Sequence, residues 1–190
     1  MRELGDWLSN LEPEATLESR HVYNGKILNL RVDRVMLRGG SQAIREVVEF
    51  HGGVAVVALD GAGRVLLVRQ YRYAVGRYLL ELPAGNLEPG ERPEECAARE
   101  LEEETGYRAA RVEPLCSFYS APGGTDELMH VFWATGLASG RSRPDDDERI
   151  EVVPVMWDDA LAMVARGEIC DAKSVIGLLM AQSRRAGERG

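Results

Sequence analysis

The sequence between Gly85 and Tyr107 constrains the fold more than any other part of the chain. It reads GNLEPGERPEECAARELEEETGY, in which a proline and a glycine flank a run rich in Ala, Glu and Arg. Proline is favoured in the first turn of a helix, and glycine is favoured just past the last residue, where the backbone turns left-handed. The segment therefore predicts a helix over residues 94–105, between Pro93 and Gly106.

The predicted helix has an unusual charge distribution, because its last two turns carry Glu100, Glu103 and Glu104. The partial negative charge at a helix C-terminus repels carboxylates, so these side chains cost stability unless a cation joins them. Residues three and four apart lie about 5–6 Å from each other on one helix face, so their oxygens can converge. Oxygen ligands favour hard cations, and we expect Mg²⁺ or Mn²⁺ rather than zinc.

An acidic run is most often a solvated helix face. Here that interpretation must account for eight residues at fixed spacings, which average usage would produce on the order of once in 10⁹ starting points. The spacing resembles the Nudix box, G-x5-E-x7-R-E-U-x-E-E-x-G-U, in which U is a bulky aliphatic residue. Tyr107 departs from the pattern by replacing the last aliphatic residue. The matching residues are Gly85, Glu91, Arg99, Glu100, Leu101, Glu103, Glu104 and Gly106.

Composition argues against several other classes of protein. A net charge of −8 and a pI near 5.0 are unlike those of a general nucleic-acid binder, which clusters Lys and Arg. Cys96, Cys116 and Cys170 are far apart and lack a C-x-x-C spacing, so we expect neither a disulfide framework nor a zinc site. No secretory signal pattern and no apolar run of membrane-spanning length is present. We expect a cytoplasmic protein with no membrane or nucleic-acid partner.

The remaining sequence alternates between strand and helix signals. Residues 21–50 read as a three-stranded antiparallel unit with turns at Asn24-Gly25 and Arg38–Ser41, whereas residues 1–19 suggest a short helix or an arm. A helix with Asp158 as its N-cap and a last helix opening at Asp171 or Ser174 are also expected. Further strands are predicted at residues 54–59, 65–72, 111–120, 128–137 and 150–157, and residues 79–82 lead into the box.

This order of elements predicts an α+β fold with helices packed on a mixed sheet. The resemblance to the Nudix family implies the Nudix fold, an α/β/α sandwich. The chain length of 190 residues fits one ordinary domain with an additional arm. We expect residues 1–50 to form an N-terminal arm and antiparallel dimerisation sheet, and residues 51–190 to form the Nudix hydrolase domain.

Outside the box, the sequence most resembles bacterial ADP-ribose pyrophosphatases. The similar segments are REVVEFHGGVAVVAL from Arg45, RQYRYAVGRYLLELPAG from Arg69, the proline-glycine loop APGGTDE from Ala121, and GEICDAKSVIGL from Gly167. The resemblance implies Mg²⁺-dependent hydrolysis of ADP-ribose, or of a related nucleoside diphosphate sugar, to AMP and ribose 5-phosphate. The alternatives are another Nudix substrate, such as a GDP-sugar, NADH or a dinucleoside polyphosphate, and a module that senses a nucleotide without hydrolysing it.

The same resemblance assigns roles to residues of the site. It implies that metal ions are held by Ala84, through its backbone carbonyl, and by Glu100, Glu103 and Glu104. Glu103 would also serve catalysis by holding another ion or its water. The catalytic base is expected in the acidic loop Asp145–Glu148, where the strand that follows favours Glu148; a solvated loop is the alternative. The residues with a structural role in the motif would be Gly85, Glu91, Arg99 and Gly106, with Arg99 paired to Glu91.

Substrate recognition is expected from Arg45, Arg72, Glu81, Gly123 and Gly124. A guanidinium can form two bonds to a phosphate and stack on a base, which favours the two arginines at these sites. Exposure on an edge strand is the alternative for both. Glu81 and the backbone of the two glycines are expected to bind ribose hydroxyls. In the resembling family the N-terminal sheet is exchanged between two subunits, so we predict a homodimer.

Overall fold

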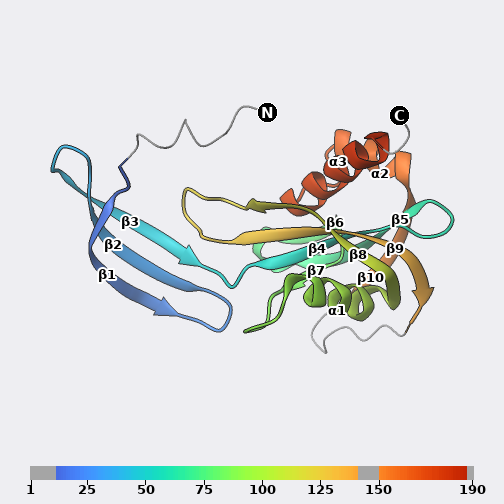
Figure 1. The fold of residues 1–190 in the computed structure, drawn as a ribbon, viewed down its shortest axis with the longest axis horizontal. Coiled ribbons are helices and arrows are strands. Elements are labelled where there is room, and N and C mark those ends of the chain that lie inside the picture. The colour runs from blue at the N-terminus through green and yellow to red at the C-terminus, as the bar shows by residue number, and fades with distance from the viewer. Residues whose placement is uncertain (1–11, 141–149, 188–190) are drawn as a thin grey trace. The chain divides into compact units, whose positions relative to one another are not determined.

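The computed structural model describes residues 12–140 and 150–187, which form two compact units (Figure 1). The smaller unit contains the N-terminal residues as far as Phe50 together with Ala121–Asp126. The larger unit contains His51–Ser120 and the residues from Glu127 onward. None of the described helices is both long enough and apolar enough to cross a bilayer.

The smaller unit is built on a three-stranded antiparallel sheet. Its strands are β1 (Ala15–Asn24), β2 (Asn29–Met36) and β3 (Gln42–Glu49), paired in that order. This confirms the predicted antiparallel unit. Strand β1 nevertheless begins before His21, which corrects the expectation of a helix or arm for the described residues that precede it. All ten residues of β1 are exposed, so no alternation of buried and exposed positions marked the strand in the sequence.

The loop Ala121–Asp126 is bonded to the end of β3. The N–H of Val48 donates to the carbonyl of Gly124 at 2.9 Å, and the N–H of Asp126 donates to the carbonyl of Val48. The Asp126 carboxylate accepts a bond from the N–H of Phe50 at 2.9 Å. The proline-glycine loop and the N-terminal sheet are therefore parts of one structural unit.

The larger unit contains two sheets. The first is mixed, with the order β7 (Ala84–Asn86), β4 (Gly53–Ala58), β9 (Leu128–Ser139) and β8 (Tyr107–Tyr119), and its β4 and β9 run parallel. The second is antiparallel, with the order β10 (Glu151–Met156), β5 (Arg64–Arg72) and β6 (Arg77–Glu81). A short 3-10 helix, η2 (Tyr73–Val75), joins β5 to β6.

Strand β4 is buried on both faces because helices cover the mixed sheet from both sides (Figure 1). Its residues Val54 and Val56 share a core cluster with α1 (Pro93–Thr105). Ala55 and Val57 share the other cluster with α2 (Trp157–Ala165) and α3 (Ala172–Gly187). Such a strand reads as a continuous apolar run instead of an alternating one. The predicted α+β fold with an α/β/α sandwich is confirmed.

The ends of the helices follow local signals. Helix α1 has Pro93 in its first turn, and Gly106 ends it with a left-handed φ of 73°. Helix α3 opens at Asp171, whose carboxylate accepts a bond from the N–H of Ser174 at 3.2 Å. The predicted N-cap Asp158 is wrong, because α2 already begins at Trp157. The indole of Trp157 is 5% exposed and packs edge-on against Trp133, so tertiary packing moved the start of this helix.

Candidate active site

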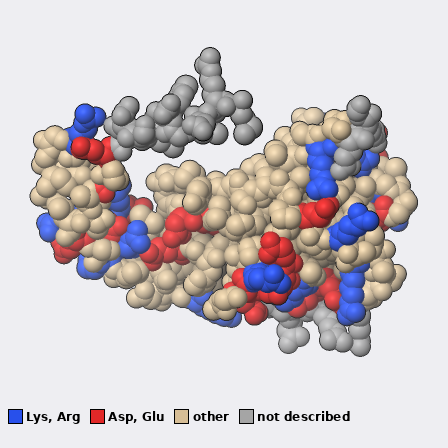
Figure 2. All heavy atoms as spheres, in the orientation of Figure 1, with Lys and Arg blue, Asp and Glu red and all other residues tan. Residues whose placement is uncertain are grey.

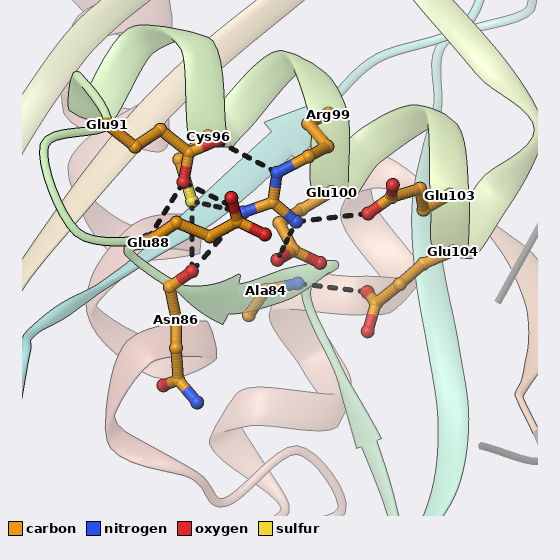
Figure 3. A network of polar contacts seen from close by, with 9 residues as sticks. All are labelled: Ala84, Asn86, Glu88, Glu91, Cys96, Arg99, Glu100, Glu103 and Glu104. Atoms are coloured by element: carbon orange, nitrogen blue, oxygen red, sulfur yellow. Dashed lines mark hydrogen bonds and ion pairs between the residues drawn. The ribbon is translucent and has the colours of Figure 1, made fainter. Parts of the chain in front are cut away.

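Helix α1 packs across β4, β7 and β8 and brings its acidic side chains against β7. The side chain of Glu104 is buried, and its Oε2 accepts a bond from the N–H of Ala84 at 2.9 Å (Figure 3). Because Ala84 is the first residue of β7, this bond fixes the strand to the last turn of the helix. The backbone that was expected to supply a metal ligand thus lies beside a buried carboxylate.

Gly85 follows directly and is required by close packing. A Cβ atom at this position would overlap the Glu100 carboxylate, so the acidic side chain occupies the space that any other residue would fill. Only glycine lets the β7 backbone and Glu100 come this close. The carboxylates of Glu100 and Glu104 are therefore both held against two consecutive residues of β7.

Arg99 links three acidic residues of the box (Figure 3). Its Nε and Nη2 donate to the two oxygens of Glu91 at 2.8 and 2.9 Å. Its Nη1 donates to Glu100 at 2.7 Å and to Glu103 at 3.0 Å. The hydrogen bonds from Arg99 lower the pKa of Glu91 to about 2, and those from Glu91 raise the pKa of Arg99. The pairing with Glu91 is the one suggested by the sequence, whereas the bonds to Glu100 and Glu103 were not anticipated.

The turn before α1 is fastened by further bonds. Glu91 also accepts a bond from the N–H of Glu88 at 3.0 Å, and the thiol of Cys96 donates to the carbonyl of Asn86 at 3.4 Å. Burial raises the pKa of Cys96 to about 12, so this cysteine stays a neutral packing residue instead of a nucleophile.

The donor atoms of the acidic cluster suit a hard cation, although they are not gathered around one point. Glu100 and Glu103 are turned toward Arg99, and Glu104 is turned toward Ala84. Within residues 12–140 and 150–187, no group of three or more His, Cys, Asp or Glu side chains has the arrangement of a metal site. The oxygen-only chemistry of the cluster is of the kind that a hard divalent cation binds. In Figure 2, basic and acidic atoms lie interleaved over the region of α1.

A second polar cluster surrounds Glu81, which is only 1% exposed. Its carboxylate accepts two bonds from Arg72, at 2.9 and 2.7 Å, and one from Lys173. Burial opposes the ionisation of Glu81, but the bonds from Arg72 and the charge of Lys173 outweigh it and hold its pKa below the usual value. The pKa of Arg72 is raised by its bond to Glu81 and further by the charges of Glu104 and Asp171. Arg72 therefore lies within electrostatic reach of α1.

Other predicted residues belong to the smaller unit or fall outside the described residues. Arg45 belongs to the smaller unit, where its Nε donates to Glu14 at 2.9 Å. Gly123 and Gly124 belong to the same unit, in the loop bonded to β3. Glu148 lies outside the described residues. The sequence analysis did not single out Lys173, which bonds to Glu81. One signal was available, because Lys26 and Lys173 are the only lysines in a chain whose other basic side chains are arginines or histidines.

Comparison with known proteins decides the family. A model of the NUDIX domain matches residues 49–174, a span that contains the box and extends from the last residue of β3 to the first turn of α3. The chain belongs to the Nudix family. A second family model, the nucleoside diphosphate sugar hydrolase N-terminal domain, matches residues 14–48 of this Nudix protein, which is the antiparallel sheet of the smaller unit.

Individual relatives extend over most of this Nudix protein. The ADP-ribose pyrophosphatase of Bacillus subtilis (strain 168) is 40% identical and aligns over 91% of this chain and 95% of its own length. A GDP-mannose pyrophosphatase of Yersinia enterocolitica is 40% identical over 74% of this chain and 78% of its own. The crystal structure of an ADP compounds hydrolase matches the fold with a TM-score of 0.84, covering 94% and 97% of the two chains at 21% identity.

Family membership also bears on the cofactor. Nudix hydrolases generally depend on a divalent metal ion. In this Nudix protein the acidic end of α1, where Glu104 bonds to the backbone of β7, carries carboxylate oxygens of the kind that such an ion binds.

Proposed function

We propose that this Nudix pyrophosphatase hydrolyses the pyrophosphate bond of ADP-ribose, or of a related nucleoside diphosphate sugar, to AMP and ribose 5-phosphate. The observation that carries the proposal is the junction of α1 with β7, where Glu100 and Glu104 lie against Ala84 and Gly85. A relative that is 40% identical over 91% of the chain and is named ADP-ribose pyrophosphatase supports the choice of substrate.

The residues of the box and the adjoining strand have two proposed roles, metal binding and the positioning of the metal ligands. Glu100, Glu103 and Glu104 and the carbonyl of Ala84 would hold Mg²⁺, or alternatively Mn²⁺. When bound, the cation neutralises the diphosphate and activates water for in-line attack at phosphorus. Arg99 holds the loop of Glu91 against α1 and keeps Glu100 and Glu103 oriented. The bond between Glu104 and the Ala84 N–H fixes the position of the β7 backbone.

Proton transfer and substrate binding need residues beyond α1. Glu148, in the acidic loop outside the described residues, is the proposed base that takes a proton from the attacking water. Arg72 and Arg45 are proposed to bind phosphate or adenine, because a guanidinium matches both chemically. Gly123 and Gly124 are proposed to bind ribose hydroxyls. Glu81 was expected to do so as well, but it is 1% exposed and its carboxylate is bonded to Arg72 and Lys173.

The experiment is direct. Purified protein is incubated with ADP-ribose and MgCl₂, and the products are separated by anion-exchange chromatography. We expect AMP and ribose 5-phosphate in equal amounts, and neither product when EDTA is present. A Glu104→Gln protein purified in the same way shows how much activity comes from contaminants. If wild type forms no more AMP than this variant with either Mg²⁺ or Mn²⁺, the proposed function is wrong. Binding of ADP-ribose without turnover would then favour a nucleotide-sensing module.

A GDP-sugar is the second candidate substrate. It is favoured by the GDP-mannose pyrophosphatase that is 40% identical over 74% of this chain. A panel of ADP-ribose, GDP-mannose, NADH and a dinucleoside polyphosphate, compared by kcat/KM at one Mg²⁺ concentration, distinguishes the candidates. A kcat/KM for GDP-mannose above that for ADP-ribose would assign the enzyme to the second class.

We further propose that the protein is a homodimer that acts in the cytoplasm. The N-terminal sheet exposes large apolar side chains, whose exposed fractions lie between 42% and 61%. These residues are Leu17, Val22, Tyr23, Ile27 and Ile44. Exposed apolar clusters commonly mark association surfaces. Light scattering coupled to size-exclusion chromatography is expected to give twice the mass of 21.0 kDa, and a monomer at working concentration would contradict the dimer.

A further inference from the structure

The first turn of α3 approaches the buried carboxylate of Glu81, and the box does not explain this contact. Lys173 donates from Nζ to Oε2 of Glu81 and, at 2.8 Å, to Oδ1 of Asp171. Oε2 of Glu81 also accepts the bond from Nη2 of Arg72 at 2.7 Å. One oxygen atom is therefore shared by a lysine from α3 and an arginine from β5.

Lys173 is held in place by bonds on both sides of it in the sequence. Asp171 accepts a bond from the N–H of Ser174, which closes the first turn of α3. The hydroxyl of Ser174 is fully buried and accepts a bond from the N–H of Leu82 at 2.8 Å. Leu82 follows Glu81 directly, so α3 is fastened to the same short segment that carries the carboxylate. The side chain of Lys173 is itself only 15% exposed.

The bonds of Arg72 leave part of its guanidinium for a ligand. Glu81 engages Nε and Nη2, so Nη1 is the nitrogen that this carboxylate does not use. The side chain of Arg72 is 39% exposed, whereas Glu81 beneath it is buried. A guanidinium held by two parallel bonds keeps a fixed plane, and its remaining N–H groups then have a fixed direction.

We propose that Lys173 is a positioning residue that acts through Glu81 to keep Arg72 oriented for an anionic group of the substrate. This inference rests on the proposed function, because it takes the substrate to be a nucleoside diphosphate sugar. The charges of Arg72, Lys173, Glu81 and Asp171 cancel. Loss of Lys173 leaves a net negative charge next to Arg72, and that charge both draws the guanidinium inward and repels a diphosphate.

A lysine suits this place better than an arginine does. Its ammonium group is a compact point charge that can share one carboxylate oxygen with a neighbouring guanidinium, whereas a second planar fork would compete for both oxygens. The choice is notable because Lys26 is the only other lysine in the sequence.

The test is a double-mutant cycle with Lys173→Met and Glu81→Gln, assayed on the nucleoside diphosphate sugar that wild type hydrolyses best. We expect Lys173→Met to raise KM about tenfold or more while kcat changes by less than about threefold. In the Glu81→Gln background the same change should alter KM by less than about twofold, because the group through which Lys173 acts is gone. Lys173→Arg keeps the positive charge, so its KM is expected to lie between those of wild type and Lys173→Met.

Lys26→Met is the matched control, because it removes the same charge from an exposed turn of the N-terminal sheet. Its KM should remain within about twofold of wild type. An unchanged KM in Lys173→Met, or an equal rise in both backgrounds, would overturn the inference in favour of a purely structural lysine. If the single variant does not fold, Glu81→Gln is compared with the double variant, which carries no unpaired carboxylate at residue 81; a KM difference above about fivefold overturns the inference.

Failure of the inference and failure of the proposed function are distinguishable. If wild type hydrolyses no sugar nucleotide, the proposed function fails before any variant is compared. The same cycle is then measured on the Kd of ADP-ribose by titration calorimetry. Coupling between residues 81 and 173 in that Kd supports the positioning role, and its absence refutes it.

Discussion

Gly85→Ala tests the junction of β7 and α1 without removing a charged group. A Cβ at residue 85 would fall inside the Glu100 carboxylate, 1.9 Å from its nearest oxygen, so the carboxylate must withdraw by about 1.5 Å to restore ordinary contact. The atoms that must move are the end of a flexible side chain, so the free energy of unfolding should change by less than about 1 kcal/mol. A displacement of about 1 Å in a catalytic group can nevertheless cost about 10²-fold in rate, or roughly 2.7 kcal/mol in barrier height.

The assay measures kcat for ADP-ribose at saturating Mg²⁺ together with the melting temperature. We expect kcat to fall about 100-fold with a melting temperature close to that of wild type. Gly61→Ala is the matched control, because a Cβ at Gly61 meets nothing within 4 Å and the backbone there is not left-handed. This variant should leave both quantities unchanged. The reasoning is refuted if Gly85→Ala keeps kcat within about threefold of wild type while Mg²⁺ binding is also unchanged.

Three further changes test other parts of the site. Glu104→Gln should lower kcat by several orders of magnitude at nearly wild-type stability, and retention of more than about a tenth of the activity would exclude Glu104 as a metal ligand. Glu91→Gln should destabilise the fold fully above about pH 4.5 and progressively less below it. The pKa of Glu91 is lowered from 4.5 to about 2, so its pairing with Arg99 stabilises the protein at neutral pH, and this stabilisation is lost as the pH falls from 4.5 toward 2. The difference from wild type in urea unfolding should be about 1–2 kcal/mol at pH 7, after allowance for solvent screening, and should vanish near pH 2. Glu148→Gln should lower kcat at least about 100-fold, and a turnover number within a few-fold of wild type would remove its role as the base.

Local signals in the sequence were sufficient to predict the elements whose ends are set by the backbone preferences of proline and glycine. Helix α1 lies within one residue of its predicted bounds, because Pro93 and Gly106 act through their own φ preferences. The predicted mixed sheet was correct, because β4 is apolar at every position and needs cover on both faces. Strand β1 was not recognised over Ala15–Ser19, because an exposed strand carries no buried stripe.

Contacts between distant residues could not be derived in the same way. The box spacing placed Glu91 near Arg99, since both belong to one loop-helix segment. The same spacing did not show that Arg99 would also donate hydrogen bonds to Glu100 and Glu103, because those bonds depend on side-chain rotamers that packing determines. In the register of β5 with β6, Glu81 lies opposite Val68 and Arg72 lies opposite Arg77, so the register alone does not bring Arg72 to Glu81. Lys173 reaches Glu81 only through the docking of α3. Such clusters become visible only when the chain is folded.

The bonds between β3 and the loop Ala121–Asp126 have a consequence for how this protein could be altered. Val48 and Phe50 clamp the loop through Gly124 and Asp126, although more than seventy residues of chain separate them. A truncated chain that starts at residue 51 would keep α1 and its carboxylates but lose this clamp. Grafting the first fifty residues of one relative onto the remainder of another would likewise transplant the strand that supports this glycine-rich loop.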